Sequence, residues 1–368
     1  MKLFTKSTKQ AHASQKSRLI IYNLAMDESN PSLRFTQDWV NEFSTHFNEV
    51  IVYATHVGVH KTNSNVKVIK LGGGSVSRRI LALVRLVTSL PKVVRHRSRT
   101  IVFHHMSTFT TVFPGVFLRI LGIKQGLWYS HSKVDKFLRI GASNMDVIFS
   151  PHRDAFPLKD SQLPLHFSGH GVSNKFVQAN QKNMSLSVKI QILSVGRIAR
   201  IKKLERLIEF CGRLESKIKG RIVLNLVGPF DDYEYLKELQ ELANKYLLPV
   251  CFIGALKTEE VIEYYKESHF YYMGTPNSVD KAALEASFLG CIPISSNNAL
   301  QELTGVKSLF WESPQILSSP SQQLNYYIRL NESELKEISN TICNTSRVYN
   351  QLSSLISYIV RIMSTRQF

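Results

Sequence analysis

The chain has 368 residues, of which 43% are hydrophobic and 20% charged, and its formal net charge at pH 7 is +18. This composition excludes a disordered chain, and the length is typical of two domains rather than one. No segment has the roughly 18 consecutive apolar residues of a membrane-spanning helix, and the polar, basic residues 1–16 lack the apolar centre of a secretory signal. We therefore expect a cytoplasmic protein.

Short apolar segments alternate with helical patterns along the N-terminal half. A helix is predicted at residues 35–47. Strands rich in β-forming residues are predicted at residues 18–25, 50–54, 66–71, 100–104, 126–129 and 146–150. Because strands and helices alternate, we expect a parallel sheet with right-handed crossovers.

The pattern pauses in the polar segment 176–187, an expected linker, and then restarts. Strands are predicted at residues 189–195, 221–227, 250–253, 269–273 and 292–295, and helices at residues 203–214, 232–246, 258–267 and 280–289. The apolar run 247–256 is expected to form a buried strand with its flanks. Two such α/β units place a ligand cleft at the carboxyl ends of their strands.

We expect three parts along the chain. Residues 1–178 form a basic Rossmann-like domain, and residues 179–350 form a second Rossmann-like domain. Residues 351–368 form a C-terminal helix that crosses back to the first domain.

Positive charge is concentrated in the first half of the chain. Residues 1–180 carry 24 basic and 9 acidic side chains, and the remainder carry 22 and 19. A basic amphipathic pattern over residues 77–90 makes this region a candidate surface for the acceptor or for anionic membrane. Its candidate residues are Arg78, Arg79, Arg85 and Arg95. The apolar face of the same helix is also expected to pack on the sheet. A nucleic-acid partner is not expected, because no recognition helix, RNP-type strand or zinc module is present.

No metal site or disulfide framework is expected. The four cysteines lie at least 40 positions apart, without a CxxC pair or a nearby histidine at ligand spacing. The acidic pair Asp231 and Asp232 opens an amphipathic helix and is expected to cap it.

The segment SVGRIARIKKLERLI, residues 194–208, carries the most informative chemistry. A strand is expected to end at Gly196, where glycine allows the backbone to approach a ligand closely. Arg197 and Lys202 then place two cations at the end of that strand, which suits a diphosphate leaving group. A solvated basic turn before a surface helix is the alternative.

This segment resembles the "VGRL…K…LI" element of family 4 retaining glycosyltransferases. The resemblance implies that Arg197 and Lys202 contact the donor diphosphate. Lys203 stands where that family has glycine. The strand segments at residues 226–229 and 250–255 are similar to the family's central strands.

Residues 277–293, NSVDKAALEASFLGCIP, resemble the family's signature of two glutamates separated by seven residues. Glu285 occupies the second position, which implies binding of the nucleotide ribose hydroxyls. Asn277 replaces the first glutamate, and Ser-Val-Asp replaces the usual Gly-Phe-Gly. The resemblance places Asn277 and Ser278 beside the sugar and phosphates, with backbone N–H groups of residues 278–281 available to the donor. Asp280 is expected to cap the next helix.

Residues 128–132, WYSHS, resemble the family's strand-end histidine near the anomeric centre of the donor. His131 matches that position. His104 and His105 also follow a predicted strand and are further candidates to face the cleft. The polar loop 26–34 takes the place of the family's glycine-rich loop but has no glycine.

The resemblance spans about residues 18–310 and implies a GT-B fold, two Rossmann-like domains facing each other across a deep cleft. It implies that residues 1–178 are the acceptor-side domain and that residues 179–350 bind the nucleotide sugar. It implies a retaining, metal-independent hexosyltransferase that uses a nucleoside-diphosphate sugar as donor and needs no cofactor. The expected acceptor is a glycan or lipid-linked molecule of cell-surface polysaccharide or glycolipid assembly, reached at the inner face of the plasma membrane. The alternative, suggested by Asn277, is a weak or inactive glycosyltransferase-like protein that binds carbohydrate or nucleotide.

Overall fold

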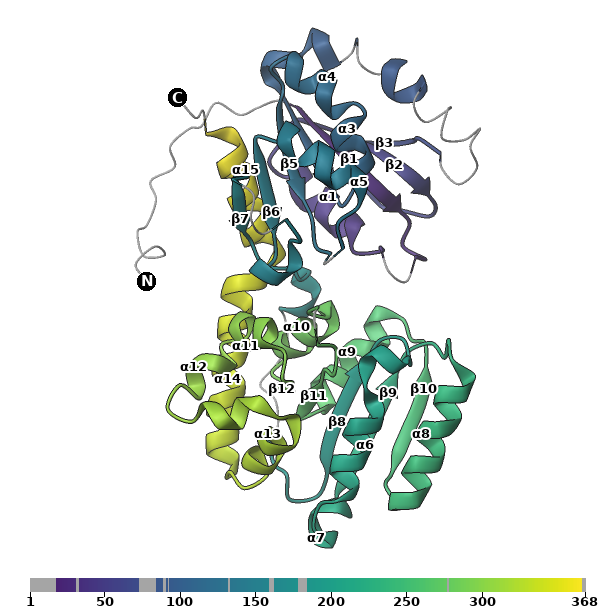
Figure 1. Ribbon diagram of the computed structural model, residues 1–368, viewed down its shortest axis with the longest axis vertical. Helices are drawn as coiled ribbons and strands as arrows, with labels where there is room; N and C mark the ends of the chain where they lie inside the picture. The colour runs from purple at the N-terminus through teal and green to yellow at the C-terminus, as the bar shows by residue number, and fades with distance from the viewer. Residues whose placement is uncertain are drawn as a thin grey trace. The chain divides into compact units, whose positions relative to one another are not determined.

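The computed structural model describes residues 18–30, 33–72, 84–88, 91, 93–131, 133–158, 162–177, 184–276 and 278–365 (Figure 1). Arg78, Arg79, Asn277 and half of the expected linker, residues 178–183, lie outside the described residues. Contacts divide the chain into one unit of Met1–Ser168 with Ile356–Phe368 and a second unit of Gly169–Leu355. In the described parts of the chain, no helix is long and apolar enough to cross a membrane.

The division of the chain differs from the boundary expected at residue 178. Val172 forms a parallel bridge with Gln351, and its N–H donates to the carbonyl of Asn350 at 2.6 Å. Residues from Gly169 onward are therefore tied to the end of the second unit. In the sequence, the second unit is an insertion between the last strand and the final helix of the first.

The described residues of the first unit form a seven-stranded parallel sheet in the order β3-β2-β1-β4-β5-β6-β7. Its strands are β1 (Arg18–Met26), β2 (Glu49–Val57), β3 (Val66–Lys70), β4 (Thr100–His105), β5 (Lys124–Trp128), β6 (Val147–Ser150) and β7 (Leu165–Phe167). The central strands are buried on both faces, as in other parallel sheets. The sequence predicted all of these strands except β7.

Helices cover both faces of this sheet (Figure 1). On one face, α1 (Thr36–Ser44) places Trp39 with its ring centroid 4.9 Å from that of Trp128. The C-terminal part of α15 (Leu352–Ser364) places Tyr358 against Phe149, with ring centroids 6.2 Å apart. On the other face lie the helical residues 84–88 and 93–95 and the helices α3 (Thr108–Val112), α4 (Gly115–Ile120) and α5 (Lys136–Gly141).

The second unit has, within its described residues, a five-stranded parallel sheet in the order β10-β9-β8-β11-β12. Its strands are β8 (Ile190–Val195), β9 (Ile222–Val227), β10 (Val250–Gly254), β11 (Phe270–Tyr272) and β12 (Ile292–Ile294). The helices are α6 (Leu204–Gly212), α7 (Ser216–Lys219), α8 (Tyr233–Tyr246), α9 (Thr258–Glu267), α10 (Lys281–Phe288), α11 (Asn298–Leu303), α12 (Val306–Leu309), α13 (Pro320–Tyr327) and α14 (Glu332–Asn350). The Rossmann-like α/β architecture predicted for both halves is confirmed.

Successive residues of each strand point to opposite faces of this sheet, so two cores form. One core lies under α6, α8 and α13 and includes Tyr272. The other lies under α9, α10 and α11 and includes Tyr271. The expectation of a buried strand with its flanks in the run 247–256 is wrong, because β10 is an edge strand and Leu247 is 82% exposed.

Candidate functional site

The candidate site lies where β8 and β9 of the second unit end. Gly196 follows β8 with φ of +138°, and Gly228 follows β9 with φ of +147°. A Cβ atom at Gly228 would collide with the carbonyl of Gly196, so the two strand ends approach as closely as only glycine permits. A Cβ at Gly196 would lie 3.4 Å from Nζ of Lys202, so the structure brings Gly196 and Lys202 together.

The cations of this loop have different surroundings. The guanidinium of Arg197 lies 3.8 Å from the carboxylate of Asp231, and its side chain is 69% exposed. A loose, exposed pair of this kind contributes little to stability and leaves Arg197 able to turn toward a ligand. Arg200 instead donates two hydrogen bonds to Glu238, at 2.6 and 2.7 Å, and its guanidinium lies 5.1 Å from the ring centroid of Tyr235. Arg200 is therefore held in the structure, and Arg197 is the cation with freedom to bind.

Lys202 forms an ion pair that the sequence did not predict. Its ammonium lies 2.6 Å from Oδ2 of Asp280, and the two side chains are only 17% and 19% exposed. The same carboxylate oxygen accepts from the hydroxyl of Thr275 at 3.1 Å. Asp280 stands at the N-cap position of α10, but its side chain makes no capping hydrogen bond, so the role expected for it is wrong. Asp232 does cap its helix, since it accepts from the N–H of Tyr235 at 2.9 Å.

Lys203 has a backbone conformation that suits glycine, the residue that the resemblance implies at this position. Its φ of 50° and ψ of 43° lie in the left-handed region, where a side chain costs about 1–2 kcal/mol. Its carbonyl accepts from the hydroxyl of Tyr272 at 2.9 Å. A Cβ at Gly274 would strike the carbonyl of Lys202, so the loop is pressed against the end of β11.

Glu285 lies on α10, half-buried, on the face of the sheet that carries Tyr271. The hydroxyl of Tyr265 donates to Oε2 of Glu285 at 3.3 Å. Burial, reinforced by the nearby Glu285 charge, raises the pKa of Tyr265 well above its usual value. Tyr265 therefore stays a hydrogen-bond donor and holds the carboxylate in one orientation.

Tyr271 connects the parts of the candidate site. Its hydroxyl donates to the carbonyl of Val195, next to Gly196, at 3.1 Å. Burial raises the pKa of Tyr271 well above its usual value, and the charges of Asp280 and Glu285 act in the same direction. One buried tyrosine therefore contacts the end of β8 and is influenced by the charges of both Asp280 and Glu285.

Asn297 positions the loop before α10, and the sequence analysis missed it. Its amide donates to the carbonyls of Thr275, Pro276 and Ser278 at 3.2, 3.0 and 3.3 Å. Ser278 itself is exposed, whereas Asn297 is buried. An asparagine after a short strand has no sequence signal for this role, because its partners lie about 20 positions earlier.

His131 lies in the first unit, after β5. Its side chain is exposed, and Nδ1 accepts from the N–H of Lys133 at 3.0 Å. The alternative candidates His104 and His105 are buried in the sheet, so the suggestion that they face a cleft is wrong. Burial lowers the pKa of His104 to about 4, and its ring contacts Thr110 and Gln125 at 2.8 and 3.1 Å.

A carboxylate–imidazole pair at the end of β1 was also missed. Oδ2 of Asp27 lies 3.0 Å from Nε2 of His56, and Oδ1 accepts from the hydroxyl of Ser29 at 2.7 Å. The hydrogen bonds from Ser29 keep the pKa of Asp27 below its usual value. The polar loop after β1 thus presents an ionised carboxylate.

The two described members of the basic-surface set differ. Arg85 donates to the carbonyls of Lys70 and Leu71 at 2.7 and 3.1 Å, which anchors its helix to the end of β3. Arg95 is exposed. In the part of the chain that the structure describes, no group of three or more His, Cys, Asp or Glu side chains is arranged to hold a metal ion.

Comparison with known proteins assigns the segment that contains this site. Residues 177–302 match the family model "Glycosyl transferases group 1". The match lies in the second unit and is a similarity of this segment to that family. The segment contains Gly196, Arg197, Lys202, Ser278 and Glu285 and all five described strands of the second sheet. No curated protein matches the chain.

Solved glycosyltransferase structures share the fold of the whole chain. Anabaena HepE in complex with UDP and glucose has a TM-score of 0.69 at 11% identity, covering 95% of this chain and 99% of that chain. A glycosyltransferase from Rickettsia africae has a TM-score of 0.71 at 13% identity, covering 94% and 98%. The α,α-trehalose 6-phosphate synthase from Burkholderia multivorans has a TM-score of 0.65 at 14% identity, covering 94% and 98%. The fold class predicted from the sequence, GT-B, is confirmed.

Proposed function

We propose that the protein is a retaining glycosyltransferase that moves a hexose from a nucleoside-diphosphate sugar to a glycan or lipid-linked acceptor in cell-surface polysaccharide or glycolipid assembly. The observation that carries the proposal is the strand end at Gly196. There Arg197 and Lys202 lie at a glycine turn, and Glu285 is held by Tyr265, which lies in the same core as Tyr271. This arrangement lies within the glycosyl transferases group 1 segment.

Each residue has a role in the proposed reaction. The bond between the anomeric carbon and the β-phosphate oxygen breaks, and Arg197 and Lys202 stabilise the charge that grows on the diphosphate. The acceptor oxygen attacks from the same face, and its proton passes to the leaving diphosphate, so no protein nucleophile takes part. Glu285 accepts hydrogen bonds from the ribose hydroxyls, and N–H groups at residues 278–281 approach the phosphates. His131 lies beside the anomeric centre.

Catalysis in this scheme depends on placement and on stabilised charge, without a metal ion or other cofactor. We expect EDTA to leave transfer activity unchanged. The product should keep the anomeric configuration of the donor, which NMR of the first product formed would establish. Loss of activity in EDTA that added Mg²⁺ restores would contradict the metal-independent scheme.

UDP is the first nucleotide to test, because the HepE structures contain UDP or UDP-glucose. Isothermal titration with UDP should give binding that falls about 10–100-fold in Lys202→Gln, since a hydrogen bond to a charged group contributes about 1.5–3 kcal/mol. Lys237→Gln, on an exposed turn of α8, is the matched control and should bind like the parent. Absence of binding for UDP, GDP and ADP alike would overturn the proposal.

The role of Glu285 can be tested against the ribose itself. Glu285→Gln should weaken UDP binding about tenfold or more and should hardly change the binding of 2′,3′-dideoxy-UDP, which lacks the hydroxyl partners. An equal loss for both nucleotides would show that Glu285 acts through the fold and not through the ribose.

The ion pair between Lys202 and Asp280 favours the alternative, a weak or inactive glycosyltransferase-like protein. A carboxylate 2.6 Å from the ammonium competes with the donor diphosphate for the same cation. Release of free sugar from UDP-glucose by the purified protein distinguishes the two functions. UDP binding without hydrolysis or transfer would support the alternative.

The acceptor is proposed to be reached at an anionic membrane surface. Leu86 and Leu118 pack into one core cluster, so the helical residues 84–88 and α4 cover the same face of the first sheet. Their outward-facing side chains include apolar residues that are 42–76% exposed: Val84, Val87, Val116, Phe117 and Ile120. Arg119 of α4 and Arg95 are also exposed. Exposed apolar side chains combined with cations are typical of a membrane-interfacial surface.

Vesicle sedimentation tests this surface. The protein should bind phosphatidylcholine vesicles that contain phosphatidylglycerol more tightly than vesicles of phosphatidylcholine alone. Ile120→Asp should reduce this binding severalfold. Val188→Asp, at an equally exposed apolar side chain of the second unit, should not. Binding that is independent of both the anionic lipid and Ile120 would overturn the membrane proposal.

A further inference from the structure

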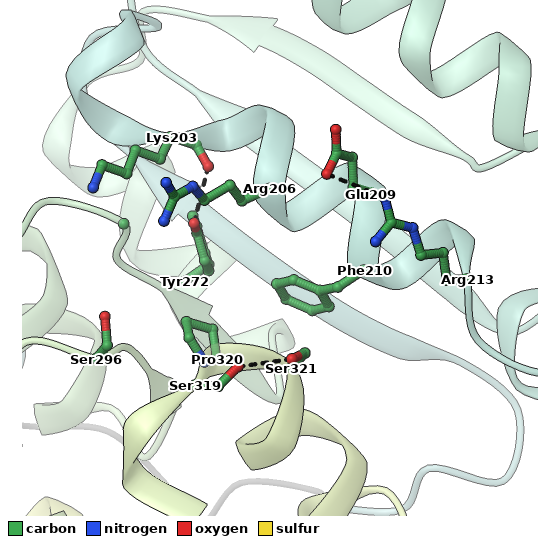
Figure 2. Close-up of a pocket in the computed structure, with 11 residues that line it drawn as sticks. Lys203, Arg206, Glu209, Phe210, Arg213, Tyr272, Ser296, Ser319, Pro320 and Ser321 are labelled. Atoms are coloured by element: carbon green, nitrogen blue, oxygen red, sulfur yellow. Dashed lines mark hydrogen bonds and ion pairs between the residues drawn. The ribbon is translucent and has the colours of Figure 1, made fainter.

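The second unit has a basic pocket that the donor site does not use. The pocket has a volume of about 210 Å³ and lies between α6, the end of β11 and the beginning of α13 (Figure 2). Lys203 and Arg206 form one wall, and Ser319, Pro320 and Ser321 lie across from them in Figure 2. The aromatic rings of Phe210 and Tyr272 contribute to the lining between these walls.

This pocket is on the opposite face of the sheet from the ribose-binding candidate. Tyr272, which lines the pocket, belongs to the core under α6, α8 and α13. Its neighbour Tyr271 belongs to the core that contains α10, the helix of Glu285. Gly274 and the carbonyl of Lys202 lie in close contact where the two faces meet. The pocket is thus next to the candidate diphosphate loop but opens from the other face.

Three cations line the pocket, against one carboxylate. Arg213 pairs with Glu209 at 3.5 Å. Among the described residues, neither Lys203 nor Arg206 forms an ion pair with a carboxylate, so both remain available to an anion. Two uncompensated positive charges beside a polar pocket favour a ligand with two negative charges.

Lys203 adds an independent observation. It holds a left-handed backbone conformation that glycine would adopt without strain. Residues in such strained conformations are concentrated at functional sites, because the surrounding fold must maintain them. At this strained position the lysine adds a cation to the pocket wall, which a glycine would not do.

Hydroxyl groups complete the lining. Ser296, Ser319 and Ser321 each contribute to it. Ser319 stands at the N-cap of α13 without capping it, and its hydroxyl lies 2.8 Å from that of Ser321. Hydroxyl donors together with arginine and lysine are the groups that bind phosphate oxygens.

We propose that this pocket binds a small phosphate-bearing molecule, separately from the nucleotide-sugar donor. Its volume is below the roughly 300–1,000 Å³ of pockets for drug-sized ligands, but it is several times the roughly 30 Å³ share of one water. A phosphate group or a phosphorylated monosaccharide therefore suits the pocket, with Arg206 and Lys203 on the phosphate. Because Lys203 follows Lys202 directly, an occupant of the pocket would also restrain the diphosphate loop.

Isothermal titration with inorganic phosphate and with glucose 1-phosphate tests the proposal and distinguishes free phosphate from a sugar phosphate. Both titrations are run with and without saturating UDP, which fills the proposed donor site and leaves the pocket open to the probe. Binding should weaken at least tenfold in Arg206→Gln and in Lys203→Gly. The glycine variant suits the left-handed backbone and is expected to fold normally. Arg197→Gln, in the diphosphate loop, should bind both probes like the parent.

The outcomes separate this pocket from the donor site. Loss of probe binding in Arg197→Gln alone, or complete competition by UDP, would assign the phosphate to the donor site and overturn the proposal. Equal binding in all variants, or no binding of either probe, would also overturn it. Probe binding that depends on Arg206 would support the pocket even if UDP did not bind, so the two proposals can fail independently.

Discussion

At the residue scale, Lys202 and Asp280 determine how much positive charge the diphosphate loop offers. The pair is mostly buried, so its charges are weakly screened by solvent. Asp280→Asn removes the competing carboxylate and keeps a side chain of the same size. We expect the variant to bind UDP several times more tightly in isothermal titration at fixed ionic strength, because Lys202 is released to the phosphates.

A matched control removes a carboxylate of the same unit far from the loop. Glu263→Gln, on the exposed face of α9 where it pairs with Lys266, should leave UDP affinity unchanged. Weaker UDP binding by Asp280→Asn would contradict the prediction and show that the carboxylate holds Lys202 in its binding position.

Because His104 is buried, we expect the stability of the first unit to depend on pH. Its pKa is about 4 in the folded protein because of burial, against about 6.5 in the unfolded chain. Between pH 6.5 and 4 the unfolded state takes up a proton that the folded state does not. Stability is therefore full above pH 6.5 and falls with decreasing pH, by up to about 1.4 kcal/mol per pH unit.

Urea unfolding followed by tryptophan fluorescence measures this effect, since Trp39 and Trp128 are buried in the first unit. His104→Gln should lose stability less steeply between pH 6.5 and 4.5 than the parent. His46 and His166 also have pKa values lowered by burial, so the parent and the variant must be compared directly. Identical slopes would show that His104 does not contribute.

Sequence reasoning located the part of the site that is local in the chain. Gly196, Arg197 and Lys202 lie within one loop, so a single string predicts their grouping. The pairing of Lys202 with Asp280 spans 78 positions and depends on β8 and β11 being neighbours, which no local pattern encodes. The left-handed backbone of Lys203 was hidden for a different reason, because lysine gives no signal for that conformation.

At the element scale, hydrophobic pattern predicted the strands that are buried on both faces. It missed β7, which has three residues with partly exposed side chains, because so short a segment carries no periodicity. It also treated the run 247–256 as buried, since apolar composition does not distinguish an edge strand from a central one. Both β7 and β10 are edge strands, and a local sequence pattern does not reveal the order of strands in a sheet.

The close contact between α6 and α8 at Gly212 predicts that a larger residue there destabilises the second unit. A Cβ atom at Gly212, in the last turn of α6, would overlap the side chain of Tyr246 at the end of α8. Gly212→Ala should therefore destabilise the second unit by about 1–3 kcal/mol in urea unfolding followed by circular dichroism.

A second glycine of the same unit is the control. Gly220 has φ of −62° and ψ of −14°, and a Cβ there would meet the carbonyl of Ser216 at an ordinary 3.4 Å. Gly220→Ala should be neutral or stabilising by about 0.4–1 kcal/mol, because it restricts the unfolded chain. Equal effects of the two substitutions would contradict the role of the α6–α8 contact.

At the scale of the whole molecule, the first unit is built from both ends of the chain. The C-terminal part of α15 supplies Tyr358, whose hydroxyl lies 3.0 Å from Nδ1 of His166, and the carbonyl of Ile362, which accepts from Lys124 at 3.3 Å. The first unit is therefore incomplete until the second has been synthesised. The candidate donor loop, in contrast, lies entirely within the inserted unit.

This arrangement predicts separate effects on the two units. Ile359 is fully buried on α15, and Ile359→Ala should destabilise the first unit by about 2–5 kcal/mol. Tryptophan fluorescence reports this loss, because Trp39 and Trp128 are buried there whereas Trp311 of the second unit is 75% exposed. The same variant should keep the UDP affinity of the parent at a temperature where it is folded. Leu324→Ala, at a fully buried residue of α13, should lower the stability of the second unit, and saturating UDP should restore part of it by about 2–3 kcal/mol at 100 times the Kd. If Ile359→Ala reduced UDP affinity as strongly as Lys202→Gln, the donor site would depend on the first unit, and its placement in the inserted unit alone would be wrong.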